Sequence, residues 1–182
     1  MFELSPSFFF SVSRASRSII TLSYDRTSKA LVHAFVSSRL DYCNSLLYGI
    51  ADGLLLKLQS IQNAAARLIT RARRRDHITP VLRELHWLPV RQRIKFKVAC
   101  FAYQSLSNQA PEYLSADCRL VTGSLRSADT RTCIVPRTQN SFGDRSFSTS
   151  GPYLWNTLPK DIRQADISYF HFRRLLKTFL FQ

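Results

Sequence analysis

Apolar residues recur every three or four positions through most of this chain, which is the period of helices that bury one face. The clearest case lies in residues 54–75. Its apolar positions are Leu58, Ile61, Ala65, Leu68 and Ala72. Residues 168–181 repeat the pattern with Phe172, Leu175, Leu176 and Phe179. Both stretches are predicted to be packed amphipathic helices.

Capping residues and prolines delimit the other predicted helices. Ser23 or Asp25 can cap a helix from about Thr27 to Leu47, closed by Gly49 and Gly53. Thr79–Pro80 opens a short helix to about His86, and Pro89 opens one that ends near Ser107–Asn108. A single turn follows in PEYL (111–114), and helical spacing returns in PYLWNTLPKDIR (152–163).

The helical pattern dissolves between residues 119 and 151 into Thr, Ser, Arg, Gly and Pro. TCIVP (132–136) is a candidate short strand or hairpin, and Gly143 and Gly151–Pro152 indicate turns. The predicted fold is mainly α, a small helical domain with an irregular basic insert. The predicted divisions are a poorly defined segment 1–22, a helical domain 23–118, the irregular region 119–151 and a C-terminal helical segment 152–182.

Charge changes this picture because it is one-sided. The chain holds 26 Lys and Arg against 12 Asp and Glu, and residues 54–100 alone hold 11 basic and two acidic residues. We expect this segment to neutralise phosphates. The candidate contacts are Arg67, Arg71, Arg73, Arg74, Arg75, Arg91, Arg93, Lys95 and Lys97. Arg67, Arg71 and Arg74 are spaced i, i+4, i+7, so a helix through them would place them on one face.

Two other interpretations of these cations stay open. They can be the solvated outer faces of packed helices, or a basic amphipathic helix can lie on an anionic membrane. The stretch ELHWLPVRQRIKFK (84–97) is central to the choice. Its Trp87, Leu88 and Pro89 predict a packed corner that starts a helix, with Ile94 and Val98 facing inward. The positions expected to be structural are Trp87, Pro89, Leu58, Ile61, Leu68 and Trp155.

Catalytic and metal-binding patterns are missing from the sequence. No carboxylates pair as a two-metal site requires, so Asp41 in RLDYCNSLL is expected on a helix surface or as a cap. GxSxG, GK[ST] and HExxH are absent. The spacings of His77, His86, Cys100, Cys118 and Cys133 do not fit a zinc finger or knuckle. We therefore expect no catalytic residues, no metal and no cofactor.

The number of cysteines and the hydropathy of the chain indicate the cellular compartment in which the protein is expected. The four cysteines are too dispersed for a disulfide framework, which favours a reducing compartment. SFFFSV (7–12) lacks a charged n-region, and no run approaches the length of a spanning helix. An intracellular protein of the nucleus or cytoplasm is expected, with no signal peptide and no transmembrane segment.

Several phrases in fixed order resemble a known family. They are ALVHAFVSSRLDYCNSLLYG, LQSIQNAAARLI, HITPVLRELHWLPVRQRIKFK, APEYL, LRS, GDRSFSTSGPYLWNTLPKDIR and FRRLLKTFLF. Over roughly residues 8–181 the chain resembles the region that follows the polymerase core in jockey-like non-LTR (LINE-type) retrotransposon reverse transcriptases. The Tyr-x-Asp-Asp motif of the polymerase does not occur here, nor does the Cys/His knuckle that some related elements carry.

The resemblance implies partners and a process but no residue-level mechanism. It implies a non-catalytic tail that binds element RNA and nicked target DNA, with little sequence specificity, during target-primed reverse transcription. No small-molecule substrate and no membrane partner are expected. Two alternatives stay open: a structural segment that packs on the polymerase through the Leu58/Ile61/Ala65/Leu68 seam, or a decayed element copy with no independent function.

Overall fold

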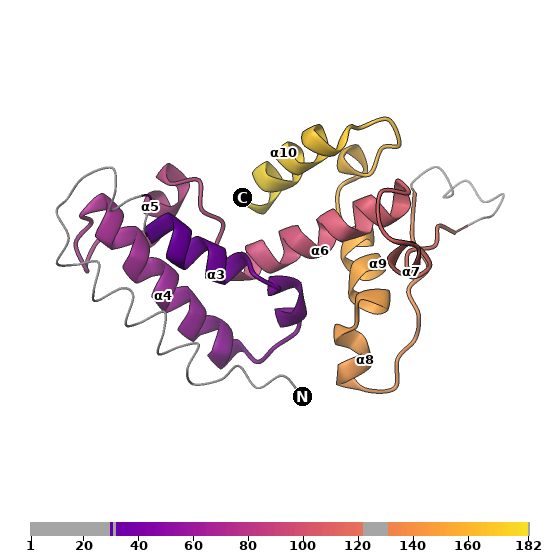
Figure 1. Cartoon of the computed structure of the whole chain (residues 1–182), viewed down its shortest axis with the longest axis horizontal. Coiled ribbons are helices and arrows are strands. Elements are labelled where there is room, and N and C mark those ends of the chain that lie inside the picture. Colours follow the sequence, from indigo (N-terminus) through magenta and orange to yellow (C-terminus); the bar gives the residue numbers. More distant parts are fainter. Residues whose placement is uncertain (1–29, 31, 122–130, 182) are drawn as a thin grey trace. The chain divides into compact units, whose positions relative to one another are not determined.

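The computed structural model describes residues 30, 32–121 and 131–181 (Figure 1). Within them the chain forms eight α-helices and no β-strand, which confirms the mainly α prediction. The chain divides into two compact units: unit 1 takes its described residues from those up to 44 and from 50–91, and unit 2 from 45–49 and from 92 onward. This division lies inside the stretch 23–118 predicted as one helical domain. None of the described helices is long and apolar enough to cross a membrane.

Unit 1 begins with a helical segment that ends earlier than predicted. A π-helical turn, His33–Ser37, leads directly into α3, Ser38–Asp41. We predicted one helix to Leu47, and this is wrong beyond Asp41. The backbone at Tyr42 is extended and Cys43 adopts a φ of 49°, which interrupts the helix. Helical conformation resumes only as a 3-10 turn, Asn44–Leu47. The predicted N-cap, Ser23 or Asp25, and the predicted start near Thr27 lie outside the described residues.

The long helix of unit 1 is α4, Asp52–Thr70, which packs against α5, Ile78–Glu84. Its buried positions are Leu55, Leu58, Gln62, Ala65 and Ala66, while Ile61 and Leu68 are half-buried. The predicted seam is thus confirmed at its centre. It does not reach Ala72, because the helix stops at Thr70 and Arg71 takes a left-handed conformation with a φ of 58°.

Helix α5 and its N-cap each begin two residues earlier than predicted. Its N-cap is His77, so Pro80 lies inside the first turn and Thr79 caps nothing. Proline is tolerated there because the N–H it lacks would have no partner within the helix. The helix ends at Glu84, and His86 has a φ of 53° that turns the chain toward Trp87.

Unit 2 is built around α6, Val90–Leu106, of which only Val90 and Arg91 are assigned to unit 1. The predicted start at Pro89 and the end near Asn108, with a φ of 54°, are both confirmed. Ile94 and Val98 are buried as predicted. The elements that follow are α7 (Glu112–Ser115), α8 (Ser141–Arg145), α9 (Phe147–Thr157), a 3-10 turn (Lys160–Ile162) and α10 (Tyr169–Leu180).

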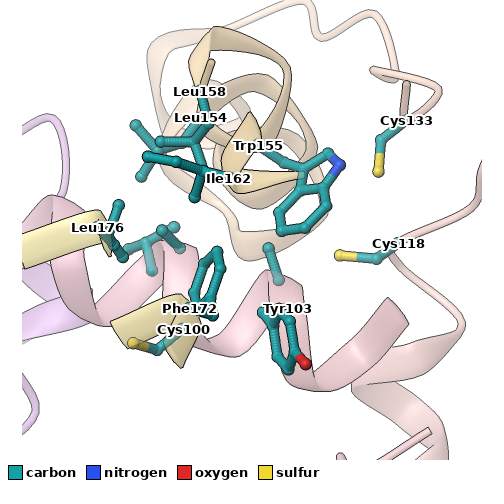
Figure 2. Packing of buried hydrophobic residues seen from close by; sticks show 13 residues of the cluster. Cys100, Tyr103, Cys118, Cys133, Leu154, Trp155, Leu158, Ile162, Phe172 and Leu176 are labelled. Atoms are coloured by element: carbon teal, nitrogen blue, oxygen red, sulfur yellow. The ribbon is translucent and has the colours of Figure 1, made fainter. Parts of the chain in front are cut away.

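Aromatic rings fill the core of unit 2 between α6, α9 and α10 (Figure 2). Tyr103 of α6 stacks on Phe172 of α10 with ring centroids 4.4 Å apart, and Trp155 of α9 lies 6.0 Å from Phe172. Trp155 and Phe172 are completely buried, as is Leu176. Trp155, which we expect to be structural, thus lies within this core, and the predicted buried face of α10 is confirmed at Phe172 and Leu176.

The stretch 131–136 is held to α9 without forming a strand. Leu120 and Cys133 make a single antiparallel bridge, flanked by hydrogen bonds of 2.8 Å from Val121 N–H and Ile134 N–H. On its other side, Asn156 accepts a hydrogen bond from Cys133 N–H and donates one to Cys133 O, each 2.8 Å. TCIVP is therefore one bridged pair and not the predicted short strand.

The irregular interpretation of 119–151 is wrong from Ser141 onward, where α8 and the first turns of α9 lie. Gly151 and Pro152 indicated a turn, yet both are buried inside α9. Gly151 is suited to this place because a β-carbon there would lie 2.9 Å from the Phe147 ring. Residues 122–130, including Arg126, lie outside the described residues.

Candidate nucleic-acid interface

The corner at Trp87–Pro89 is fixed by hydrogen bonds to its backbone. Trp87 N–H donates to Leu82 O at 2.8 Å, and the Gln62 amide donates to Leu88 O at 2.8 Å. Val90 N–H, at the start of α6, donates to Gln59 Oε1 at 2.8 Å. Trp87 and Leu88 are buried. The predicted packed corner is therefore confirmed.

Two glutamines of α4 make this corner rigid, and the sequence patterns above did not identify them. Gln62 is completely buried, and Gln59 donates to Gln62 Oε1 at 3.0 Å and to Asn63 Oδ1 at 2.8 Å. Buried amides need such partners, since an unsatisfied one costs about 1–3 kcal/mol. The signal in the sequence was the position of Gln62, four residues after Leu58 and three before Ala65, inside the apolar stripe.

The densest run of cations lies in a turn, residues 71–77, which we call the basic turn. It follows the left-handed Arg71 that ends α4. Asp76 fixes its backbone: the carboxylate accepts from Arg73 N–H at 2.6 Å and Asp76 N–H donates to Arg73 O at 3.0 Å. The side chains of Arg71, Arg73, Arg74 and Arg75 are exposed.

The prediction that Arg67, Arg71 and Arg74 share one helix face is wrong, because α4 ends before two of them. Arg67 is half-buried, and its guanidinium donates to Asp76 O at 3.4 Å, so it braces the basic turn. Arg91 is also engaged, in an ion pair with Asp52 in which both side chains are largely exposed. Within unit 1 the four turn arginines are thus exposed neighbours in sequence, while Arg67 donates to Asp76 O and Arg91 pairs with Asp52.

In unit 2, α6 contributes Arg93, Lys95 and Lys97. Lys97 is exposed, with Nζ 5.2 Å from the Phe101 ring centroid, while Arg93 and Lys95 are half-buried. Helix α10 runs antiparallel to α6, as the contacts of Tyr103 with Phe172 and of Phe96 with Arg173 indicate. It adds Arg173 and Lys177, which the charge analysis had not selected.

Four cations form what we call the α6–α10 basic face: Arg93, Lys97, Arg173 and Lys177. Burial lowers the pKa of Lys177 from its ordinary 10.5, and the positive charges of Arg93 and Arg173 lower it further. Arg173 lies over two aromatic rings, 5.6 Å from the Tyr169 centroid and 5.9 Å from that of Phe96. In the sequence, the available signal for this face was the i, i+4 spacing of Arg93 and Lys97 in α6 and of Arg173 and Lys177 in α10.

Neither metal coordination nor chemistry at the three buried thiols is favoured by the described side chains. In residues 30, 32–121 and 131–181, no three His, Cys, Asp or Glu side chains gather where they could hold a metal ion. Burial raises the pKa of Cys100 and of Cys118 to about 11, and that of Cys133 to about 12, which keeps these thiols protonated. Asp41 is exposed at the end of α3.

The arrangement offers cationic surfaces in each unit, one on a braced turn and one across two packed helices. Comparison with protein-family models, with curated proteins and with solved structures finds no match to this chain.

Proposed function

We propose that this chain is a non-catalytic nucleic-acid-binding segment that contacts the phosphate backbone of RNA and DNA. The observation that carries the proposal is the α6–α10 basic face. Burial lowers the pKa of Lys177, and the neighbouring charges of Arg93 and Arg173 lower it further because like charges repel one another. A phosphate backbone placed against them would relieve that repulsion and release counterions.

The basic turn supports the same proposal from unit 1. Its four exposed arginines can each donate two parallel hydrogen bonds to a phosphate group. Asp76 holds the backbone of the turn through Arg73, so less conformational freedom is lost on binding. Phosphate contacts of this kind position a protein without reading bases, and we expect little sequence specificity.

The resemblance to retrotransposon reverse transcriptase tails supplies the proposed setting. In that setting the chain would hold element RNA and nicked target DNA while a polymerase on another part of the polyprotein copies the RNA. The alternative of docking on the polymerase through the seam of α4 has less support, because Leu58 and Ala65 are already buried within this chain.

Salt-dependent binding tests the proposal. Affinity for a single-stranded RNA and for a DNA duplex should be measured from low to physiological salt. Replacing Lys97, Arg173 and Lys177 by Gln should reduce the slope of log affinity against log salt by about two to three, because about that many phosphate contacts are lost. The matched control replaces Lys57, Arg137 and Lys160, three exposed cations elsewhere, by Gln.

The outcomes separate a binding site from net charge. A large loss in the first variant and a small one in the control supports the proposal. Equal losses in both variants would show that only overall charge matters, and no binding at low salt would refute the proposal outright. Replacing Arg73, Arg74 and Arg75 by Gln in the same assay measures the share of the basic turn. Circular dichroism confirms that each variant remains folded.

A further inference from the structure

The side of α10 opposite its buried residues carries two cations between two aromatic residues. Phe170, Arg174, Lys177 and Phe181 follow at spacings of four, three and four, which places them on one side of a helix. We call these four residues the outer stripe. It lies opposite Phe172 and Leu176, the completely buried residues of the same helix. The stripe extends about 16 Å along the helix axis, at about 1.5 Å per residue.

The end of the outer stripe that carries Phe170 is open to solvent. Phe170 is 77% exposed, the most exposed large apolar side chain among the described residues. Arg174, one turn further on, is exposed as well. Lys177 follows, with Nζ 6.0 Å from the Phe181 ring centroid, and Arg173 lies beside it. One exposed apolar residue is ordinary on a protein surface. An exposed ring with Arg173 and Arg174 one turn along the helix, and Lys177 two turns along, is a more specific combination.

The chemistry of this combination matches one class of nucleic acid. Base faces are covered by neighbouring bases within a duplex, but they are accessible in a single strand. Proteins that hold single strands combine a cationic track for phosphates with aromatic side chains on which bases stack. A surface of cations alone would bind duplex and single strand through the same phosphate contacts.

We propose that the outer stripe binds single-stranded nucleic acid, with Phe170 stacking on an unpaired base and Arg173, Arg174 and Lys177 contacting the phosphates beside it. This inference rests on the proposed function, since the same cations serve both. It adds a preference for single strands, with no requirement for a particular base, because every base has a face on which a ring can stack.

Substitution of Phe170 tests the inference in the full chain. The probes are a uridine homopolymer and a DNA duplex, compared at one salt concentration. Phe170→Ala should weaken binding to the single strand by roughly ten-fold, in keeping with the measured value of base–aromatic stacking, and leave duplex binding unchanged. Phe170→Trp should retain affinity for the single strand, and stacking on a base should quench the fluorescence of the new tryptophan. The quenching can be assigned to it because the two native tryptophans, Trp87 and Trp155, are buried.

A matched control is Phe142→Ala, which removes a ring that is 76% exposed on α8 of the same unit. It should change neither affinity. If Phe170→Ala leaves both affinities unchanged, or lowers them equally, the inference is wrong while the proposed function stands. If the unmodified chain binds neither probe, the proposed function fails and the inference fails with it.

Discussion

The basic turn and the α6–α10 basic face carry positive charge in opposite ways. In the turn, the cations are neighbours in sequence, their side chains are exposed, and a single aspartate fixes the backbone through Arg73. In the α6–α10 basic face, the cations come from helices about 80 residues apart, and their positions depend on a packed core. Charge density along the sequence predicted the arginines of the basic turn. It predicted only Arg93 and Lys97 of the α6–α10 basic face and not Arg173 and Lys177.

The interiors of the two units also differ. In unit 1 the corner at Trp87–Pro89 is fixed by Gln62, which donates to Leu88 O, and by Gln59, which accepts from Val90 N–H. Unit 2 relies on the rings of Tyr103, Trp155 and Phe172 (Figure 2). Disrupting one support should therefore affect one unit more than the other, and the four predictions below use this contrast.

The largest effect is expected from Trp155→Ala. Removing a completely buried indole should lower the free energy of unfolding by about 3–5 kcal/mol, measured by urea denaturation. The variant also loses the 2.7 Å hydrogen bond from Trp155 Nε1 to Arg131 O. Tyr153→Ala on the same helix is the control, because Tyr153 is mostly exposed, and it should cost less than about 0.5 kcal/mol.

The same variant tests the comparison itself. With α10 loosened, phosphate binding that depends on Lys97, Arg173 and Lys177 should fall, while the part that depends on Arg73–Arg75 persists. Loss of both contributions together would mean that the basic turn also depends on the core of unit 2.

A smaller effect is expected from Gln62→Ala in unit 1. The change leaves Leu88 O without its donor and removes one of the two acceptors of the Gln59 amide, which should cost about 1–3 kcal/mol in the free energy of unfolding. Ser60→Ala, at an exposed position of α4, provides the control and should be close to neutral. A Gln62→Ala protein as stable as its parent would show that the amide network does not hold the corner.

The third prediction concerns the pKa of Lys177. Arg173→Gln should raise this pKa toward 10.5 because one repelling charge is removed, and nuclear magnetic resonance of the lysine side chain can follow it. At pH values between the lowered pKa of Lys177 and 10.5, the unfolded chain binds more protons than the folded one. The free energy of unfolding of the parent therefore increases as pH rises through that window. Arg173→Gln should flatten this gain, whereas Lys160→Gln should leave it intact.

The smallest effect is expected from Asp52→Asn. This change breaks an exposed ion pair with Arg91, and such pairs contribute about 0–1 kcal/mol. Stability should hardly change, yet Arg91 becomes available to phosphate, so affinity for nucleic acid at low salt should rise slightly. Reduced affinity would indicate that the ion pair orients Arg91 for binding.

Local patterns predicted the helices well where burial and helical period agree. The seam of α4, the start of α6 at Pro89 and the buried face of α10 all followed from spacing. Two of the errors fall where the backbone leaves the helix at residues other than glycine, and another falls at Gly151–Pro152, where a predicted turn lies inside α9. Cys43 and Arg71 have positive φ, and nothing in their side chains announces that conformation.

The candidate surfaces could be predicted only in part, for a related reason. Arginines adjacent in sequence are visible as a run, but Arg173 and Lys177 join Arg93 and Lys97 only because Phe172 stacks on Tyr103. That contact joins residues distant in sequence, and periodicity within one helix does not encode it. Arg131 illustrates the converse: it lies in the region 119–151 predicted to be irregular, yet its guanidinium donates to Gln164 O at 3.3 Å.

The paired hydrogen bonds between Asn156 and Cys133 have a consequence for self-association. Cys133 turns its N–H and C=O away from the bridge with Leu120, which is how an edge strand presents itself to another chain. The amide of Asn156 supplies one acceptor and one donor there, as the backbone of a neighbouring strand would. A helix side chain thereby occupies the backbone groups of Cys133 that an edge strand would offer for intermolecular pairing.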